Sequence, residues 1–325
     1  PKSVDNAIID LVENFDSVAL HGYTSAQGDG KVRETIAQYI NNRFNTEITA
    51  NNIYMTCGAA ASLTIVMNAI MQKDDECIVF TPYFPEYGVF LERTGAKLVE
   101  VQSEEKTFQI DMKNFEQAIT EKTKAVIINS PNNPSGVVYT VDTIEKMCSL
   151  LKKKEEEYGH PIFLITDEPY RELVYDDTEV PYIINYYDNT FVCYSYSKAL
   201  SLPGERIGYI VVSPKMVDEQ DAYAAVCGAG RALGYVCAPS MLQRVIEKCI
   251  DDTADISIYK KNRDLLYNAL TEMGYECVYP DGAFYLFVKA MCDDSHKFCE
   301  KAKEHELLLV PADSFGTPGY VRVSY

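Results

Sequence analysis

The chain of 325 residues is 47% hydrophobic and 24% charged, a composition that is typical of globular proteins and excludes disorder as the main state. Its 30 basic and 48 acidic residues give a net charge of −18, which repels nucleic-acid backbones and anionic membrane surfaces. We therefore expect neither as a partner. The length suits a two-domain enzyme subunit, in which an anionic ligand would require a local cluster of Lys and Arg side chains.

The cysteines and histidines offer little material for a metal site. The ten cysteines are scattered without a C-x-x-C pair, and there are four histidines. We predict no metal site, and we expect most cysteines to be small buried hydrophobic residues in a reducing compartment. No signal segment opens the chain, and its longest apolar stretch, Gly58 to Gln72, is too short to span a bilayer. These features predict a soluble, cytoplasmic protein.

Short β-rich segments alternate with amphipathic helical segments over most of the first two thirds of the chain. This alternation predicts an α/β fold with a mostly parallel seven-stranded sheet that helices cover on both faces. A helix at residues 31–44 precedes the first strand. The predicted strands are residues 53–56, 77–80, 97–101, 125–129, 162–166, 191–195 and 207–212, and the helices between them are residues 59–71, 87–94, 112–119 and 141–158.

The last third of the chain has a different pattern. Long helices follow Ser213, and from Asp255 on the pattern predicts a smaller α+β domain with helices at 255–273 and 294–305 and strands at 275–278, 284–288, 307–310 and 321–324. We expect a large domain of residues 20–235 and a small domain of residues 236–325 together with 1–19. Both chain ends are expected to be incomplete.

Polar residues at the ends of the predicted strands are the first candidates for a site, because ligands of such sheets bind beyond the carboxyl ends of the strands. After residue 56 come Gly58 and two alanines, whose backbone amides could face a phosphate, although small residues also simply pack a helix on a sheet. Asp167 ends an apolar strand, where an unpaired charge is costly. Lys198 follows another strand, where desolvation would lower its pKa, although a surface lysine is the commoner case.

Four motifs occur in this order at the strand ends: NNPSG at residues 132–136, DEPY at 167–170, SYSK at 195–198 and GERIG at 204–208. Together they resemble the fold-type I, class I aminotransferases that use pyridoxal phosphate, in particular the aspartate aminotransferase-like group. The resemblance covers residues 21–325. It implies the fold-type I architecture and a pyridoxal 5′-phosphate cofactor.

The resemblance assigns roles around the cofactor ring. Lys198 matches the lysine that holds the cofactor as an internal aldimine and then shuttles the proton. Asp167 matches the acid that pairs with the pyridinium nitrogen. The cofactor would then supply the cation that a buried carboxylate requires. Asn133 and Tyr170 match the pair that binds the 3′ oxygen of the ring, and Lys198, Asp167 and Tyr170 are thus the expected catalytic residues. Phe84 matches the aromatic residue that stacks on the ring, with its neighbour Tyr83 as the alternative.

For the cofactor phosphate, the resemblance implies the backbone amides of Ala59 and Ala60 with Ser195 and Arg206. Many relatives carry a hydroxyl or lysine side chain at this loop, so binding here would rest on the amides. Tyr23 matches a tyrosine that reaches the phosphate of the neighbouring subunit. The resemblance therefore implies a homodimer with shared active sites.

For the substrate, Arg322 matches the arginine that binds the α-carboxylate as a planar fork, beside Asn133. Arg231, in a segment of small residues, is a candidate for reading a distal carboxylate, but an exposed arginine is the default. The many tyrosines could equally line a pocket for aromatic amino acids.

The resemblance implies transfer of an amino group from an L-amino acid, of aspartate or aromatic type, to a 2-oxo acid by a ping-pong mechanism. One alternative is a pyridoxal phosphate-dependent C–S β-lyase, which uses the same carbanion. Another is a non-catalytic aminotransferase-like sensor domain, against which the retained Lys198 and the negative net charge both argue.

Overall fold

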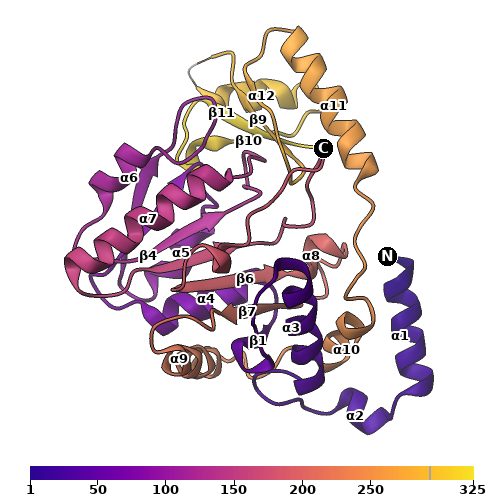
Figure 1. Ribbon diagram of the computed structural model, residues 1–325. Helices are drawn as coiled ribbons and strands as arrows, with labels where there is room; N and C mark the ends of the chain where they lie inside the picture. The colour runs from indigo at the N-terminus through magenta and orange to yellow at the C-terminus, as the bar shows by residue number, and fades with distance from the viewer. Residues whose placement is uncertain (293) are drawn as a thin grey trace.

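The structure is a computed structural model that describes residues 1–292 and 294–325 (Figure 1). A seven-stranded sheet forms its centre, in the order β1-β7-β6-β5-β4-β2-β3. Within the sheet, β7 pairs antiparallel with β1 and β6, and the remaining neighbours pair parallel. The strands are β1 (Ile53–Thr56), β2 (Glu76–Thr81), β3 (Lys97–Gln102), β4 (Thr123–Asn129), β5 (Phe163–Asp167), β6 (Thr190–Ser195) and β7 (Gly208–Val212). The predicted α/β class and mostly parallel sheet are confirmed.

Helices cover both faces of this sheet (Figure 1), which explains why strands such as β5 are buried along their whole length. One face packs against α4 (Ala59–Ile70), α5 (Glu86–Glu92) and α9 (Glu219–Ala232). The other packs against α6 (Met112–Ala118) and α7 (Val141–Tyr158) at the β3 end. At the β1 end it packs against α1 (Lys2–Asn14), α2 (Ser17–His21), α3 (Gly30–Phe44) and α10 (Ser240–Lys248).

Local sequence signals fix the ends of these helices. Asp29 caps α3 by accepting hydrogen bonds from the Lys31 and Val32 amides, and Thr140 caps α7 in the same way. Gly159 ends α7 with a φ of 71°, a left-handed conformation that glycine adopts without strain. The predicted helices at 31–44 and 141–158 therefore agree closely with the structure.

A second, four-stranded antiparallel sheet is built by the C-terminal part of the chain, shown in orange and yellow in Figure 1. Its core includes Leu286, Val288 and Val321, against which side chains of α11 and α12 pack. The order is β10-β11-β9-β8. The elements are α11 (Ser257–Glu272), β8 (Cys277–Val278), β9 (Tyr285–Lys289), α12 (Ser295–Lys303), β10 (Val310–Pro311) and β11 (Tyr320–Ser324).

The chain that leaves β5 ties the two sheets together. Its Val174 forms an isolated antiparallel bridge with Gly282, just before β9, and the Ala283 amide donates to the Leu173 carbonyl at 2.8 Å. Arg263 of α11, a fully buried side chain, forms an ion pair with Asp176 at 2.6 Å. These contacts hold the start of β9 close to the carboxyl end of β5.

The predicted division at residues 235 and 236 stays a prediction. Both α10, which follows that point, and α1 pack against the seven-stranded sheet through residues such as Leu11 and Val245. The four-stranded sheet begins later, at Cys277. Within the described residues, no helix combines the length and apolar character that a membrane crossing requires.

Candidate active site

One cavity of about 420 Å³ collects the predicted site residues. It lies at the carboxyl edge of the seven-stranded sheet, where strand register brings Asn129 beside Asp167 and Ser195 beside Gly208. Ten of the predicted residues line this cavity, namely Ala59, Ala60, Phe84, Asn133, Asp167, Tyr170, Ser195, Lys198, Arg206 and Arg322.

The N-terminus of α4 and Arg206 form one end of the cavity. Gly58 precedes α4 with a φ of 92°, and no side chain caps the first amides of the helix. A Cβ at Gly58 would lie 2.7 Å from Arg206 Nη2, so the guanidinium sits directly against this turn. Free amides at a helix N-terminus beside a guanidinium form an anion-binding site. The site suits a phosphate, as the sequence predicts.

We expect Gly58→Ala to raise the dissociation constant for pyridoxal phosphate by about ten-fold or more, because the new methyl group strains a left-handed residue and displaces Arg206. Fluorescence titration of the cofactor-free protein would measure this. Gly204→Ala is the matched control, since a Cβ there meets nothing within 4 Å. Equal affinities for both variants would contradict the assignment.

Two serines extend the phosphate end. Ser195 caps the short helix α8 (Tyr196–Ala199), accepting from the Ser197 amide. The two hydroxyls lie 2.7 Å apart, and Arg206 Nη1 donates to Ser197 Oγ at 3.2 Å. Ser197 also lines the cavity, although the sequence analysis did not single it out. The sequence feature that could have identified Ser197 is its position between Ser195 and Lys198 in the SYSK motif.

Asp167 lies at the end of β5 and is 5% exposed. Its Oδ2 accepts a hydrogen bond from the Tyr87 hydroxyl at 2.7 Å, whereas its Oδ1 is buried without a partner in the described parts of the chain. Burial raises the pKa of this carboxyl to about 7, and the bond from Tyr87 acts in the opposite direction. The free Oδ1 therefore suits a cationic N–H donor from a ligand.

Lys198 reaches the same cavity from α8. Burial, together with the positive charges of Arg206 and Arg322, lowers the pKa of its ammonium group. Its Nζ lies 5.1 Å from the centre of the Phe284 ring. A half-buried lysine with a lowered pKa has the properties of a nucleophile or a general base.

Arg322, on β11, brings the four-stranded sheet into the cavity. Its guanidinium contacts the rings of Tyr285 and Phe315, with Cζ 4.5 and 5.2 Å from their centres. Nη1 donates to Asn133 Oδ1 at 2.8 Å, while Nε is buried with no partner among the residues described. The free part of the guanidinium suits a carboxylate.

Three residues named by the sequence analysis lie elsewhere. Tyr23 is 95% exposed and lies outside the cavity of its own chain. Tyr83, the alternative to Phe84, donates instead to Glu100 on β3 at 2.7 Å. Arg231 is an exposed residue in the last turn of α9 and is not among the residues that line the cavity.

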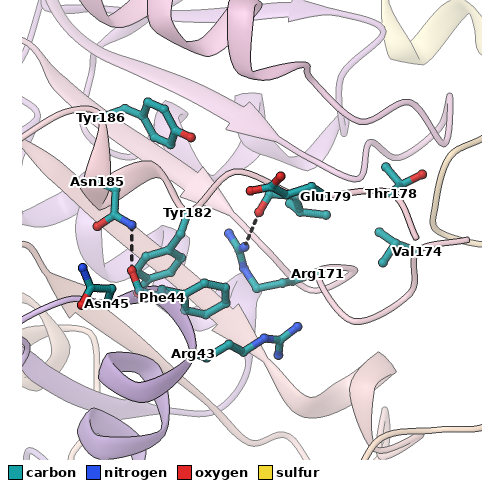
Figure 2. A pocket seen from close by; sticks show the side chains of 11 residues that line it. Arg43, Phe44, Asn45, Arg171, Val174, Thr178, Glu179, Tyr182, Asn185 and Tyr186 are labelled. Carbon is teal, nitrogen blue, oxygen red and sulfur yellow. Dashed lines mark hydrogen bonds between the residues drawn. The ribbon is translucent and has the colours of Figure 1, made fainter. Parts of the chain in front are cut away.

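A second cavity, of about 440 Å³, is lined by residues of α3 and of the loop after β5 (Figure 2). It also contains two arginines, but both already have acidic partners. Arg171 Nε donates to Glu168, and Arg43 pairs with Glu172 at 2.6 Å. A ligand carboxylate would have to compete with these glutamates. The first cavity is therefore the candidate active site.

Fold and cavity together define an enzyme of the aminotransferase type, with a lysine after β6, an acid at the end of β5 and an arginine on the small sheet. The chain matches the family model "Aminotransferase class I and II" over residues 1–325. It therefore belongs to this family, whose members typically use pyridoxal phosphate, and it is an aminotransferase.

Relatives with known names support the same family. The chain is 59% identical to an amino transferase from Eubacterium rectale of known structure, covering 100% of this chain and 82% of that one with a TM-score of 0.98. It is 33% identical to an aspartate aminotransferase from Thermotoga maritima over 309 residues, which are 93% of this chain and 78% of that protein. It is 29% identical to an aspartate/prephenate aminotransferase from Thermus thermophilus, with coverage of 93% and 78%.

Proposed function

We propose that this aminotransferase uses pyridoxal 5′-phosphate to move an amino group from an L-amino acid of aspartate or aromatic type to a 2-oxo acid, in two half-reactions of a ping-pong cycle. The observation that carries the proposal is the meeting of Lys198, Arg322 and the unpartnered Oδ1 of Asp167 in one cavity. Asp167 Oδ1 and Arg322 Nε have no hydrogen-bond partner among the residues that the structure describes, and a ligand of this chemistry would supply one to each.

The residues fit the cofactor along its length. The α4 amides, Ser195, Ser197 and Arg206 would hold the phosphate. Asp167 Oδ1 would accept a hydrogen bond from the protonated ring nitrogen, and Phe84 would cover a ring face. Asn133 and Tyr170 would bind the ring oxygen. When bound, the cofactor supplies a carbonyl carbon that takes up the amino group and a ring that accepts the electron pair left by the Cα–H bond.

The protein supplies orientation and proton transfer. Arg322 binds the substrate α-carboxylate, and Asn133 fixes one side of the guanidinium. Lys198 Nζ, whose lowered pKa favours the neutral amine, would hold the cofactor in the resting enzyme. With its amine free, Lys198 would act as the base that takes the proton from the substrate Cα and as the acid that gives it back. Buried Asp167 holds the negative charge that keeps the ring nitrogen protonated.

The proposed donor class follows from the names of the relatives and from the lining of the cavity. The relatives from Thermotoga maritima and Thermus thermophilus carry names that include aspartate, and the second name also includes prephenate. Tyr170 and Tyr285 give this cavity two aromatic walls. Aspartate-type and aromatic donors therefore both remain within the proposal.

The deciding experiment is a panel of amino donors with 2-oxoglutarate, scoring transferred nitrogen together with released ammonia and sulfide. We expect nitrogen transfer from aspartate or an aromatic amino acid and no release of sulfide from cysteine-like substrates. Release of ammonia and sulfide without transfer would identify a C–S lyase instead. No turnover of any donor would contradict the proposal.

We further propose a homodimer in which Tyr23 reaches the phosphate of the neighbouring subunit. Its exposure of 95% leaves the ring free for such a contact. If sites are shared, each active site takes Lys198 from one subunit and Tyr23 from the other. Tyr23→Ala and Lys198→Ala then each remove one of these two contributions, and each variant alone should be inactive. Unfolding and refolding a mixture of the two variants should then restore about a quarter of wild-type activity, since half of the molecules regain one of two sites. No recovery, or a monomer in sedimentation, would contradict sharing.

A further inference from the structure

Tyr285, the first residue of β9, is a cavity residue that the reaction described above does not use. It is 7% exposed and makes two contacts with proposed site residues. Its hydroxyl lies 3.0 Å from the Tyr170 hydroxyl, and its ring lies against the Arg322 guanidinium, with Cζ 4.5 Å from the ring centre. One side chain thus touches both the group proposed for the cofactor and the group proposed for the substrate.

The hydroxyl contact has a defined direction once Tyr170 binds the cofactor. Each tyrosine hydroxyl carries one proton, and Tyr170 would use its own to donate to the ring oxygen. Burial and the neighbouring Tyr285 raise the pKa of Tyr170, so that proton is retained. Tyr285 must then be the donor of the pair, and a hydroxyl that accepts a hydrogen bond becomes a stronger donor itself.

The ring contact acts on the orientation of Arg322. Phe315 also lies against the guanidinium, with Cζ 5.2 Å from its ring centre, and Asn133 Oδ1 accepts from Nη1. A partly buried guanidinium in contact with two aromatic rings is held by cation–π attraction. Its plane is therefore fixed before a carboxylate arrives, which lowers the ordering cost of binding.

We propose that Tyr285 is a positioning residue with two separable roles: its hydroxyl donates to Tyr170, and its ring fixes the plane of Arg322. This inference rests on the proposed function, because Tyr170 and Arg322 serve the cofactor and the substrate there. The first role should show in the protonation of the bound cofactor. The second should show in the affinity for substrate.

The first test compares Tyr285→Phe with wild-type holoenzyme by titrating the absorbance of the bound cofactor against pH. Without the Tyr285 hydroxyl, Tyr170 becomes a weaker donor to the ring oxygen of the cofactor. The deprotonated form of the cofactor is the more negative one, so it loses more stabilisation from this hydrogen bond than the protonated form does. The midpoint pH should therefore rise, while KM for the amino acid stays within about two-fold because the ring remains. In a Tyr170→Phe background, Tyr285→Phe should produce no further shift. An unchanged midpoint in the single variant would overturn the first role.

The matched control is Tyr175→Phe, which removes another buried tyrosine hydroxyl, bonded to the Ala283 carbonyl. Tyr175 does not line the cavity, so the midpoint should stay at its wild-type value. A shift as large as that of Tyr285→Phe would show that any loss of a buried hydroxyl near β9 moves the midpoint. That result would overturn the assignment to Tyr285.

The second test uses Tyr285→Leu, which removes the ring. KM for the amino acid should rise by about 5- to 30-fold, the size of a desolvated cation–π contact, with a smaller change in kcat. The same substitution in an Arg322→Lys background should raise KM less. An unchanged KM would overturn the second role. If the leucine variant does not fold, the phenylalanine variant still decides the role of the hydroxyl.

The outcomes also separate this inference from the proposed function. A wild-type protein that binds no pyridoxal phosphate, or transfers no nitrogen, would overturn both. A wild-type protein that does both, with Tyr285→Phe and Tyr285→Leu identical to it, would overturn the inference on Tyr285 alone.

Discussion

Replacing Lys198 with alanine is expected to lower the rate of amino transfer by about 10⁴-fold or more. The substitution removes the amine whose lowered pKa makes it both the attachment point for the cofactor and the base at Cα. The variant should still bind pyridoxal phosphate, because the α4 amides and Arg206 remain. Borohydride should fix the cofactor to the wild type and not to the variant, as mass spectrometry of the intact chains would show.

Lys113→Ala is the matched control for this experiment. Lys113 is an exposed lysine on α6 that does not line the cavity, so its loss should leave both turnover and labelling at wild-type levels. Turnover of Lys198→Ala within ten-fold of wild type would contradict the role of Lys198. Labelling of that variant at another lysine would do the same.

Replacing Asp167 with asparagine is expected to lower kcat by about 10²- to 10³-fold, the size of losing one preorganised electrostatic contact. The amide keeps the size of the side chain and can still accept from Tyr87, but it has no charge to hold a ring nitrogen protonated. Cofactor should remain bound through the phosphate end. Steady-state kinetics with saturating cofactor measure the effect, and Asp188→Asn, at an exposed loop residue, is the control.

The same substitution should change the pH dependence of stability in the cofactor-free protein. Burial raises the pKa of Asp167 to about 7, against about 3.9 in an unfolded chain. The folded state therefore binds this proton more tightly, so the stabilisation is complete below about pH 4 and is lost as pH rises to about 7. Relative to Asp167→Asn, the free energy of unfolding of the wild type should fall by about 4 kcal/mol over this range.

Denaturant unfolding of both proteins between pH 4 and pH 8 tests this expectation. Bound cofactor should weaken the trend, since a cation beside Oδ1 favours the ionised carboxylate. Parallel curves for the two cofactor-free proteins would contradict the placement of the carboxyl in a dry site.

The sequence predicted the seven-stranded sheet well because its strands are short β-rich runs between helices with clear signals, such as Asp29 and Thr140 at helix starts. Because parallel strands bring their carboxyl ends to one edge, the strand pattern also pointed to Asp167 and Lys198 as neighbours, whereas Arg322, on the four-stranded sheet, was assigned through the family resemblance. The direction of β7, antiparallel to both neighbours, has no such signal. A strand buried on both faces has a continuous hydrophobic sequence, and this pattern does not depend on whether the strand runs parallel or antiparallel to its neighbours.

Contacts between distant side chains were harder to predict. The Tyr87 ring lies edge-on to that of Phe84, but nothing in the sequence pointed to the bond of Tyr87 with Asp167. Tyr285 meets Tyr170 across 115 residues of chain, with no motif at that spacing. The pairing depends on how the start of β9 docks against the segment after β5, which local patterns do not encode.

The distribution of the cavity between two sheets has a consequence for how such an enzyme could acquire new substrates. The cavity residues proposed for the cofactor come from the seven-stranded sheet and the helices and loops that follow its strands, whereas Arg322 and Tyr285 come from the four-stranded sheet. Apart from Tyr285, whose hydroxyl is proposed to act on the cofactor through Tyr170, residues of the smaller sheet can therefore be substituted to alter substrate choice while the residues proposed for the cofactor stay intact. Substrate specificity can therefore diverge within the four-stranded sheet, which the bridge between Val174 and Gly282 connects to the part of the fold proposed to bind the cofactor.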